Sequence, residues 1–171
     1  MLFYFTATGN SLYVAKQFDQ EPISIPQVIN QENLVFEDET IGVVWPVYAG
    51  EPPKMVLNFL KKAQFKTDYF YMILTYGKDD SDAPEYINNL CKEFGLHVDY
   101  INSILMVDNY LPSFDMNDQM AMDKQVDKQI KKVFKAIISA IVFFLYIPIC
   151  RYKMAKMFKN EQRIIVTSPA A

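Results

Sequence analysis

The chain is poor in the residues that most often bind metals or act as nucleophiles. Its 171 residues include two cysteines and a single histidine, His97. Cys91 and Cys150 belong to no CxxC or CxxH motif, so the sequence predicts neither a zinc site nor an iron–sulfur cluster. No Ser–His–Asp or Cys–His arrangement is recognisable, and we therefore assign no catalytic residue. We expect both thiols to be packed in the interior and His97 to be structural.

Two common phosphate-binding motifs are also missing. The chain contains neither the GxxxxGKS/T motif of P-loop proteins nor the GxGxxG fingerprint of dinucleotide-binding folds.

Residues 1–5 lack the basic segment that opens a signal peptide. We therefore expect no signal peptide and a cytoplasmic location. What the chain does have is apolar residues, at 51% of the total, enough for one domain with a sizeable core.

Charge is divided unevenly along the chain. Residues 1–123 contain 18 acids and 7 bases, a balance of −11, whereas residues 124–171 contain 2 acids and 10 bases, a balance of +8; together they give the net charge of −3. The acidic body argues against nucleic-acid binding. The basic C-terminal part is either a solvated helix face or a docking surface for an acidic partner, an anionic membrane or a following domain.

Apolar runs alternate with helical patterns along most of the chain. Strands are expected at 2–5, 41–45 and 69–75, an edge strand at 23–25, and an extended segment at 97–107. Helices are expected at 11–19, capped by Asn10 or Ser11, and at 53–63, 84–94 (ending at Gly95) and 118–146, the last as one or two helices. Residues 27–39 are expected to form a loop or a short helix, and Trp45 is expected to lie in the core. The segment RIIVTSPAA (163–171) is expected to include a strand.

This alternation predicts a parallel sheet covered by helices on both faces. Ligands of such sheets bind at the carboxyl ends of the strands, where the strand order reverses. Three turn-like loops follow the expected strands there, at 6–11, 46–52 and 75–83. We therefore expect a binding site formed by these loops.

The first loop has the composition of an anion-binding turn. It offers three hydroxyls, the Asn10 amide and backbone N–H groups at a helix start, and Gly9 permits a tight turn. It contains no lysine or arginine, so it would bind a phosphate monoester without neutralising it. The alternative is an ordinary Asx or Ser/Thr turn that caps the helix.

The second and third loops each carry a tyrosine just beyond a strand. Tyr48 and Tyr76 are placed to flank or edge a flat ring, and stacking of this kind is worth about 0.5–1.5 kcal/mol beyond burial. Alone, either tyrosine is more simply a packing residue of its loop. Beside a phosphate-binding turn, the two favour a mononucleotide with a flat ring.

These segments together resemble a known family. The stretches FYFTATGNSLYVAK (3–16), IGVVWPVYAGEPPKMVLNFL (41–60), TYG (75–77) and DNYLP (108–112) are similar to the flavodoxin-like half of proteins that join a flavodoxin domain to a ferredoxin domain. The resemblance covers residues 1–137, and TATGNS and PVYAG are its most specific parts. The third loop departs from the family, which has more glycine after TYG where this chain has KDDSDAP.

The resemblance implies an α/β fold with a five-stranded, doubly wound parallel sheet in the order 2-1-3-4-5. It divides the chain into an FMN domain at 1–137 and a C-terminal helical extension and tail at 138–171, which could lead to a ferredoxin domain. It implies that three loops bind FMN without a covalent bond. Their residues are Thr6, Ala7, Thr8, Gly9, Asn10 and Ser11; Pro46, Val47, Tyr48, Ala49 and Gly50; and Thr75, Tyr76, Gly77 and Lys78.

The function implied is electron transfer through FMN to a redox protein or a fused ferredoxin domain, as a carrier rather than a stand-alone enzyme. One alternative is an FMN-dependent reductase of a quinone or porphyrinogen, and another is a binding module that has lost the flavin. Glu51, Asp79, Asp80 and Asp82 are expected around the ring, where negative charge disfavours an anionic reduced flavin. We expect a low semiquinone–hydroquinone potential, unless these acids only keep the loop soluble.

The apolar run Ala136–Cys150 is too short to span a bilayer, which takes about 20 residues. It also contains Pro148 and is flanked by lysines. A terminal helix packed on the core is expected, and the alternative is a helix that docks on a membrane surface or on a partner.

Overall fold

The computed structural model describes residues 1–143 of the chain. It contains a compact unit, Met1–Phe134, and a second unit that begins at Lys135, of which residues 135–143 are described. Across the described residues, no helix combines the length and the apolar character that a membrane span requires. Cys150, the segment RIIVTSPAA and the run from residue 144 to 150 lie outside the described residues.

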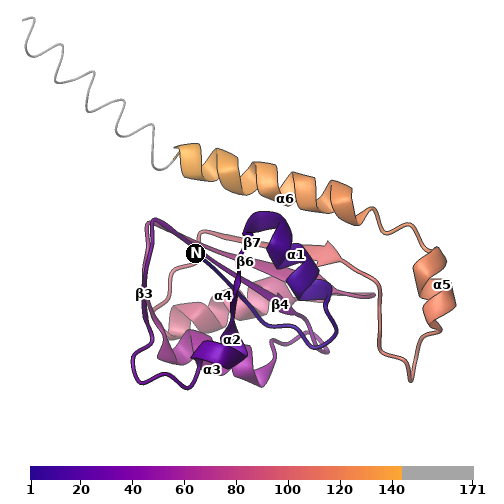
Figure 1. Cartoon of the computed structure of the whole chain (residues 1–171), viewed down its shortest axis with the longest axis horizontal. Coiled ribbons are helices and arrows are strands. Elements are labelled where there is room, and N and C mark those ends of the chain that lie inside the picture. Colours follow the sequence, from indigo (N-terminus) through magenta and orange to yellow (C-terminus); the bar gives the residue numbers. More distant parts are fainter. Residues whose placement is uncertain (144–171) are drawn as a thin grey trace, which may run out of the picture. The chain divides into compact units, whose positions relative to one another are not determined.

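The first unit is built on a five-stranded parallel sheet (Figure 1). Its strands are β1 (Leu2–Tyr4), β2 (Ile23–Ser24), β4 (Thr40–Pro46), β6 (Tyr69–Tyr76) and β7 (Tyr100–Leu105). Their order in the sheet is β2-β1-β4-β6-β7, and all neighbouring pairs are parallel. Numbered among themselves, these strands have the predicted order 2-1-3-4-5, which confirms the doubly wound α/β fold.

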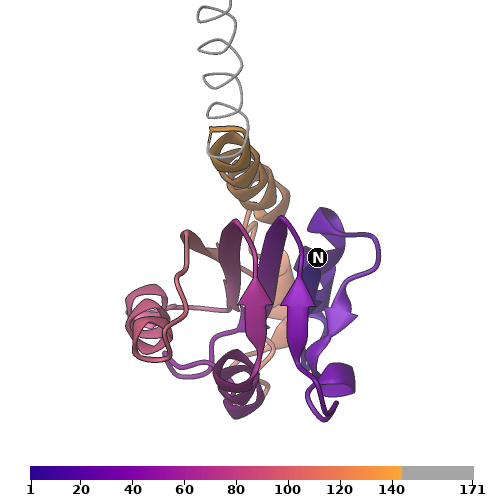
Figure 2. The same ribbon diagram turned by 90° about the vertical axis from the view of Figure 1, so that its left-hand side faces the viewer.

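Helices cover both faces of this sheet (Figures 1 and 2). These helices are α1 (Asn10–Phe18), α2 (Ile25–Val28), α3 (Lys54–Lys62) and α4 (Ala83–Glu93). The described residues also form α5 (Met116–Ala121) and α6 (Val126–Ile141). Alternate residues of β4 and β6 point to opposite faces, and both sets are buried. One set, which includes Trp45, packs in the core with residues of α2, α3 and α4. On the other face, α1 contributes Val14 and Ala15, which are fully buried.

A small second sheet was not predicted. β3 (Val35–Glu37) lies in the segment 27–39, where we expected loop or a short helix. It pairs in parallel with β5 (Gln64–Lys66), which follows directly after the expected helix 53–63. Phe36 lies 4.6 Å from Phe3, centroid to centroid, and Phe65 lies 5.6 Å from Phe59. These three-residue strands exist because their central phenylalanines pack on the core, and a strand of three residues is too short to show a periodic pattern.

The start of α1 differs from our expectation. Its N-cap is Gly9, and no side chain caps it. Asn10 and Ser11 do not serve as caps because their side chains bond elsewhere: Asn10 Nδ2 donates to the carbonyl of Val107 at 2.9 Å, and Ser11 Oγ lies 2.9 Å from Thr75 Oγ1. Gly95 terminates α4 as predicted, with φ of 75°.

The isolated reactive groups behave as packing and surface residues. Cys91 is fully buried in α4, and burial raises the pKa of its thiol to about 11. The His97 side chain is 86% exposed and precedes β7, with its Nε2 3.2 Å from the carboxylate of Asp99. The strand in the expected extended segment 97–107 begins at Tyr100, so His97 lies just before it.

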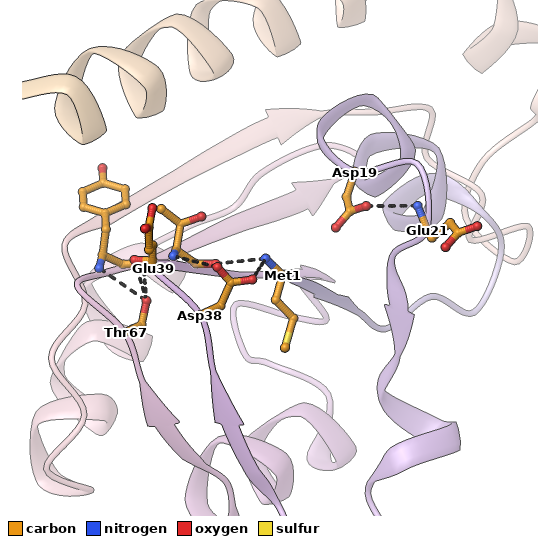
Figure 3. A network of polar contacts seen from close by, with 8 residues as sticks. Met1, Asp19, Glu21, Asp38, Glu39 and Thr67 are labelled. Carbon is orange, nitrogen blue, oxygen red and sulfur yellow. Dashed lines mark hydrogen bonds and ion pairs between the residues drawn. The ribbon is translucent and has the colours of Figure 1, made fainter. Parts of the chain in front are cut away.

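Side chains of the chain itself close the amino-terminal end of the sheet (Figure 3). The Met1 ammonium lies 2.7 Å from Asp38 Oδ2 and donates to the Thr40 carbonyl at 3.0 Å. Thr67 Oγ1 donates to the Glu39 carbonyl at 3.0 Å. The hydrogen bond from the Met1 ammonium is the main reason why the pKa of Asp38 is lowered. Backbone groups at this end thus have partners within the protein.

Candidate functional site

A cavity of about 810 Å³ opens at the other end of the sheet, beyond the carboxyl ends of the strands. The three predicted loops line it together with a fourth segment. The lining residues are Thr6, Ala7, Thr8, Asn10, Ser11, Pro46, Val47, Tyr48, Ala49, Thr75, Tyr76, Gly77, Lys78, Asp79, Val107, Asp108, Asn109, Tyr110 and Phe114. Of the predicted site residues, Gly9 and Gly50 are not in the lining; they have φ of 103° and 83° and shape the turns of their loops.

The first loop, Thr6–Ser11, is folded by its own hydroxyls. The N–H of Gly9 donates to Thr6 Oγ1 at 3.0 Å, and Asn109 Nδ2 donates to Thr8 Oγ1. Because Thr6 and Thr8 accept in these bonds, the O–H proton of each stays free to donate to a ligand. The first turn of α1 adds backbone N–H groups that no side chain caps.

Ser11 has a different position from the other hydroxyls of the loop. Ser11 and Thr75 are 0% and 2% exposed, and their hydroxyl oxygens lie 2.9 Å apart. The bond joins the start of α1 to the end of β6. Ser11 therefore fixes the position of the loop, whereas Thr8 lies on its exposed side.

The second loop is a tight turn with two left-handed residues. Tyr48 and Glu51 exchange backbone hydrogen bonds of 2.9 and 3.0 Å, and the residues between them, Ala49 and Gly50, have φ of 51° and 83°. Two positive φ angles define the type I′ class of turn, which glycine adopts without strain and alanine does not. The Val47 N–H donates to the Thr75 carbonyl at 2.8 Å and so joins this loop to the third.

The third loop requires a glycine at its centre. A Cβ atom on Gly77 would lie 2.4 Å from the carboxyl carbon of Asp108, so a side chain at this position would displace the neighbouring loop. Beside it, Tyr76 is half-buried. Burial, with smaller contributions from Asp80 and Asp79, raises the pKa of Tyr76, which therefore remains a neutral phenol.

Sequence reasoning did not assign the fourth wall of the cavity. Val107, Asp108, Asn109, Tyr110 and Phe114 follow β7 and complete the lining. The signal was the segment DNYLP, which contributed to the resemblance but received no role. Asn10 and Thr8 bond to this segment across about 100 residues of sequence, and no local pattern predicts such a pairing.

Two aromatic rings on the cavity wall are open to solvent. Tyr48 is 47% exposed and Tyr110 is 62% exposed, although both line the cavity. Large aromatic side chains usually bury most of their surface. Exposed rings at a cavity therefore offer stacking surface for a flat ligand.

The charges around the cavity have both signs, but the first loop has none. Lys78, Asp79 and Asp108 belong to the third and fourth walls. Among residues 1–143, no group of three metal-ligating side chains is close enough to hold a metal ion. The site thus combines hydroxyl and amide donors on one side with aromatic and charged residues on the other.

These residues fit a flavin mononucleotide. The uncapped helix start and the free O–H groups of Thr6 and Thr8 suit the phosphate. Tyr48 and Tyr110 suit the flat ring. The cavity volume lies within the range of about 300–1,000 Å³ typical of sites for small ligands and cofactors.

No family model matches the chain, and no curated protein matches it. Solved structures of similar fold include a flavodoxin from the domain Archaea, with 16% identity over 76% of this chain and 96% of that chain, and a TM-score of 0.45. A flavoprotein in complex with FMN from Lactobacillus acidophilus has 14% identity over 60% and 90% of the two chains, and a TM-score of 0.41. Rubredoxin oxygen:oxidoreductase from Desulfovibrio gigas has 12% identity over 79% of this chain and 35% of that chain, and a TM-score of 0.46.

Proposed function

We propose that this chain binds FMN in the cavity at the carboxyl ends of β1, β4 and β6 and transfers electrons through it. One observation carries the proposal: an uncapped helix start, wrapped by a hydroxyl-rich loop, shares a single cavity with two exposed tyrosine rings. A phosphate group and a flat ring on one ligand account for both halves. Bound FMN supplies one- or two-electron chemistry, and the protein binds and orients it.

The first loop is assigned to the phosphate. The O–H groups of Thr6 and Thr8 and the first-turn amides of α1 donate to it, and the positive end of the helix dipole favours its charge. Ser11 acts indirectly, since its hydroxyl is engaged with Thr75 and holds α1 on the end of β6.

The remaining loops are assigned to the ring. Tyr48 and Tyr110 present exposed rings from two different loops of the lining, and the backbone at Gly77 permits close approach of the third and fourth loops. Asp79 and Asp108 line the same region. Their negative charge opposes a gain of negative charge by the flavin, so we propose a low semiquinone–hydroquinone potential.

The physiological electron acceptor in this proposal is another redox protein or a fused ferredoxin domain. The exposure of Tyr48 and Tyr110 supports this choice, because it leaves one side of the site open for electron transfer to a partner. A reductase of a small acceptor would instead need a second enclosed space beside the ring.

A charge substitution in the first loop tests the proposal. Thr8 is exposed, so Thr8→Asp should fold and should weaken FMN binding at least tenfold by repelling the phosphate. Riboflavin, which lacks the phosphate, should bind both proteins equally. Flavin fluorescence quenching measures the affinities, and absorbance of the purified protein reports any FMN that is retained.

The matched control is Gln20→Asp, which adds the same charge just beyond the other end of α1. It should bind FMN as the wild type does. A wild-type protein that is colourless and gives no spectral shift with FMN would overturn the proposed function. Equal FMN affinities of Thr8→Asp and wild type would instead exclude the first loop as the phosphate site.

A further inference from the structure

Lys124 contacts the third loop of the cavity, Thr75–Lys78, but does not line the cavity itself. Its Nζ donates to the carbonyl oxygen of Gly77 at 2.8 Å and to Oε1 of Gln119 at 2.8 Å. Gly77 itself lines the cavity. The ammonium group therefore bonds directly to a residue of the cavity wall.

Gln119 extends this link to the fourth wall. Its side chain is among the few buried polar groups, with the residue 6% exposed. Besides the lysine, its Oε1 accepts the N–H of Asp108 at 3.2 Å. Lys124 and Gln119 thus connect the loop after β6 with the loop after β7.

The backbone of Lys124 is itself held in place. Gln129, in α6, donates from Nε2 to the Lys124 carbonyl at 2.7 Å. The same side chain bonds both backbone groups of Leu105 on the edge strand β7, at 3.0 and 3.2 Å. The amide of Gln129 therefore ties the segment that carries Lys124 directly to the sheet.

The next residue is in a strained conformation. Gln125 has φ of 48°, a left-handed conformation that is unfavourable for a residue other than glycine. Strain of this kind persists where surrounding contacts fix the backbone. Here the fixed feature is the turn between α5 and α6, which directs Lys124 toward Gly77.

We infer that Lys124 is a positioning residue for the cavity: it joins the Thr75–Lys78 loop to the Val107–Tyr110 loop and places a positive charge behind the wall that they form. The electrostatic part of this inference rests on the proposed binding of FMN. A fixed cation at this place stabilises a flavin that has gained negative charge, and it offsets part of the effect of Asp79 and Asp108. The mechanical part concerns the protein alone.

Hydrogen exchange of the cofactor-free protein tests the mechanical part. Lys124→Met keeps the length of the side chain but removes its donors and charge. The Asp108 amide should then exchange about tenfold faster, because Gln119 loses the lysine that holds it. The control is Lys128→Met, which removes an exposed ammonium that contacts Gln125 in the same segment. Its Asp108 amide should exchange as in the wild type.

Redox titration of the FMN-loaded protein tests the electrostatic part. Lys124→Met should destabilise the hydroquinone about tenfold relative to the semiquinone, which lowers the one-electron potential by about 59 mV. Lys124→Arg keeps the charge and should retain most of the wild-type potential. Gln119→Leu removes the hydrogen bond to Asp108 but keeps the charge of Lys124. The Asp108 amide should then exchange faster, while the one-electron potential should stay near that of the wild type.

The possible failures are distinguishable. If the Asp108 amide exchanges at the same rate in Lys124→Met as in Lys128→Met, the positioning role is overturned. Equal potentials in these two variants would overturn the electrostatic role. If the wild-type chain binds no FMN, the proposed function fails and the electrostatic role with it, while the exchange data still decide whether Lys124 holds the two loops.

Discussion

The two ends of the main sheet satisfy their polar groups in different ways. At the amino-terminal end, Asp38 binds the Met1 ammonium, Thr67 bonds the Glu39 carbonyl, and Asp99 accepts the N–H of Phe70 at 2.8 Å (Figure 3). At the carboxyl end, Gly9 starts α1 without a side-chain cap. One end is closed by its own side chains, whereas the other keeps donors for a ligand.

Locally unfavourable features lie at the carboxyl end of the sheet. At the carboxyl end, Ala49 and Gln125 both have positive φ, and Tyr48 and Tyr110 leave large aromatic surfaces in water. The bonds of the amino-terminal polar network are made within the protein and need no ligand. Strain and exposure gathered at one end indicate a binding site there, and the same end is where parallel α/β sheets bind ligands.

Two glycines provide the sharpest test of this comparison. Gly42 lies near the amino-terminal end of β4, where an added Cβ would meet the Tyr71 ring at 2.3 Å and Leu2 at 2.6 Å. Gly42→Ala should lower the free energy of unfolding by about 1–3 kcal/mol, because the added methyl group would overpack the core. FMN affinity of the folded fraction should not change. Urea unfolding followed by circular dichroism measures the loss.

Gly77→Ala should have the opposite profile. Its Cβ would collide with the Asp108 carboxyl group, which belongs to the cavity wall rather than to the core. We expect FMN affinity to fall at least tenfold with a smaller loss of stability. If Gly42→Ala weakens FMN binding as much as Gly77→Ala does, the two ends are not functionally separate.

The Ser11–Thr75 pair gives a smaller effect, on stability. Ser11→Ala leaves the buried Thr75 hydroxyl without its partner, which should cost about 1–3 kcal/mol. Removing both hydroxyls, with Thr75→Val added, should cost less than the sum of the single substitutions. A double-mutant cycle measured by urea unfolding gives this coupling. Additive costs would show that the bond does not hold α1 on β6.

The sequence predicted the large elements and the location of the site because both have strong signals. Long apolar runs such as Ile41–Trp45 become central strands, and loops that follow strands meet at one edge. The missed features depend on contacts distant in sequence. Nothing near Phe36 announces its packing on Phe3, and nothing near Lys124 announces its bond to Gly77. The caps predicted at Asn10 and Ser11 were wrong for the same reason, since tertiary partners replaced the local bond.

The smallest predicted effect concerns acid stability at the amino-terminal end. The pKa of Asp38 is lowered in the folded protein, first by its hydrogen bond with the Met1 ammonium. The stabilisation is therefore present above the unfolded pKa, near 3.8, and is lost as the pH falls through the folded value. Asp38→Asn should reduce stability modestly at pH 7, since the carboxylate is partly exposed and surface ion pairs contribute little.

At a pH below the folded pKa of Asp38, the wild type and Asp38→Asn should converge, because the wild-type carboxyl is then neutral as well. Urea midpoints at pH 7 and in strong acid measure this difference. Asp118→Asn, at an exposed carboxylate in α5, is the matched control and should leave the pH dependence unchanged. FMN affinity at pH 7 should be the same in all three proteins. An FMN affinity that falls only in Asp38→Asn would mean that the amino-terminal network also supports the cavity. The two ends of the sheet would then differ in exposure alone.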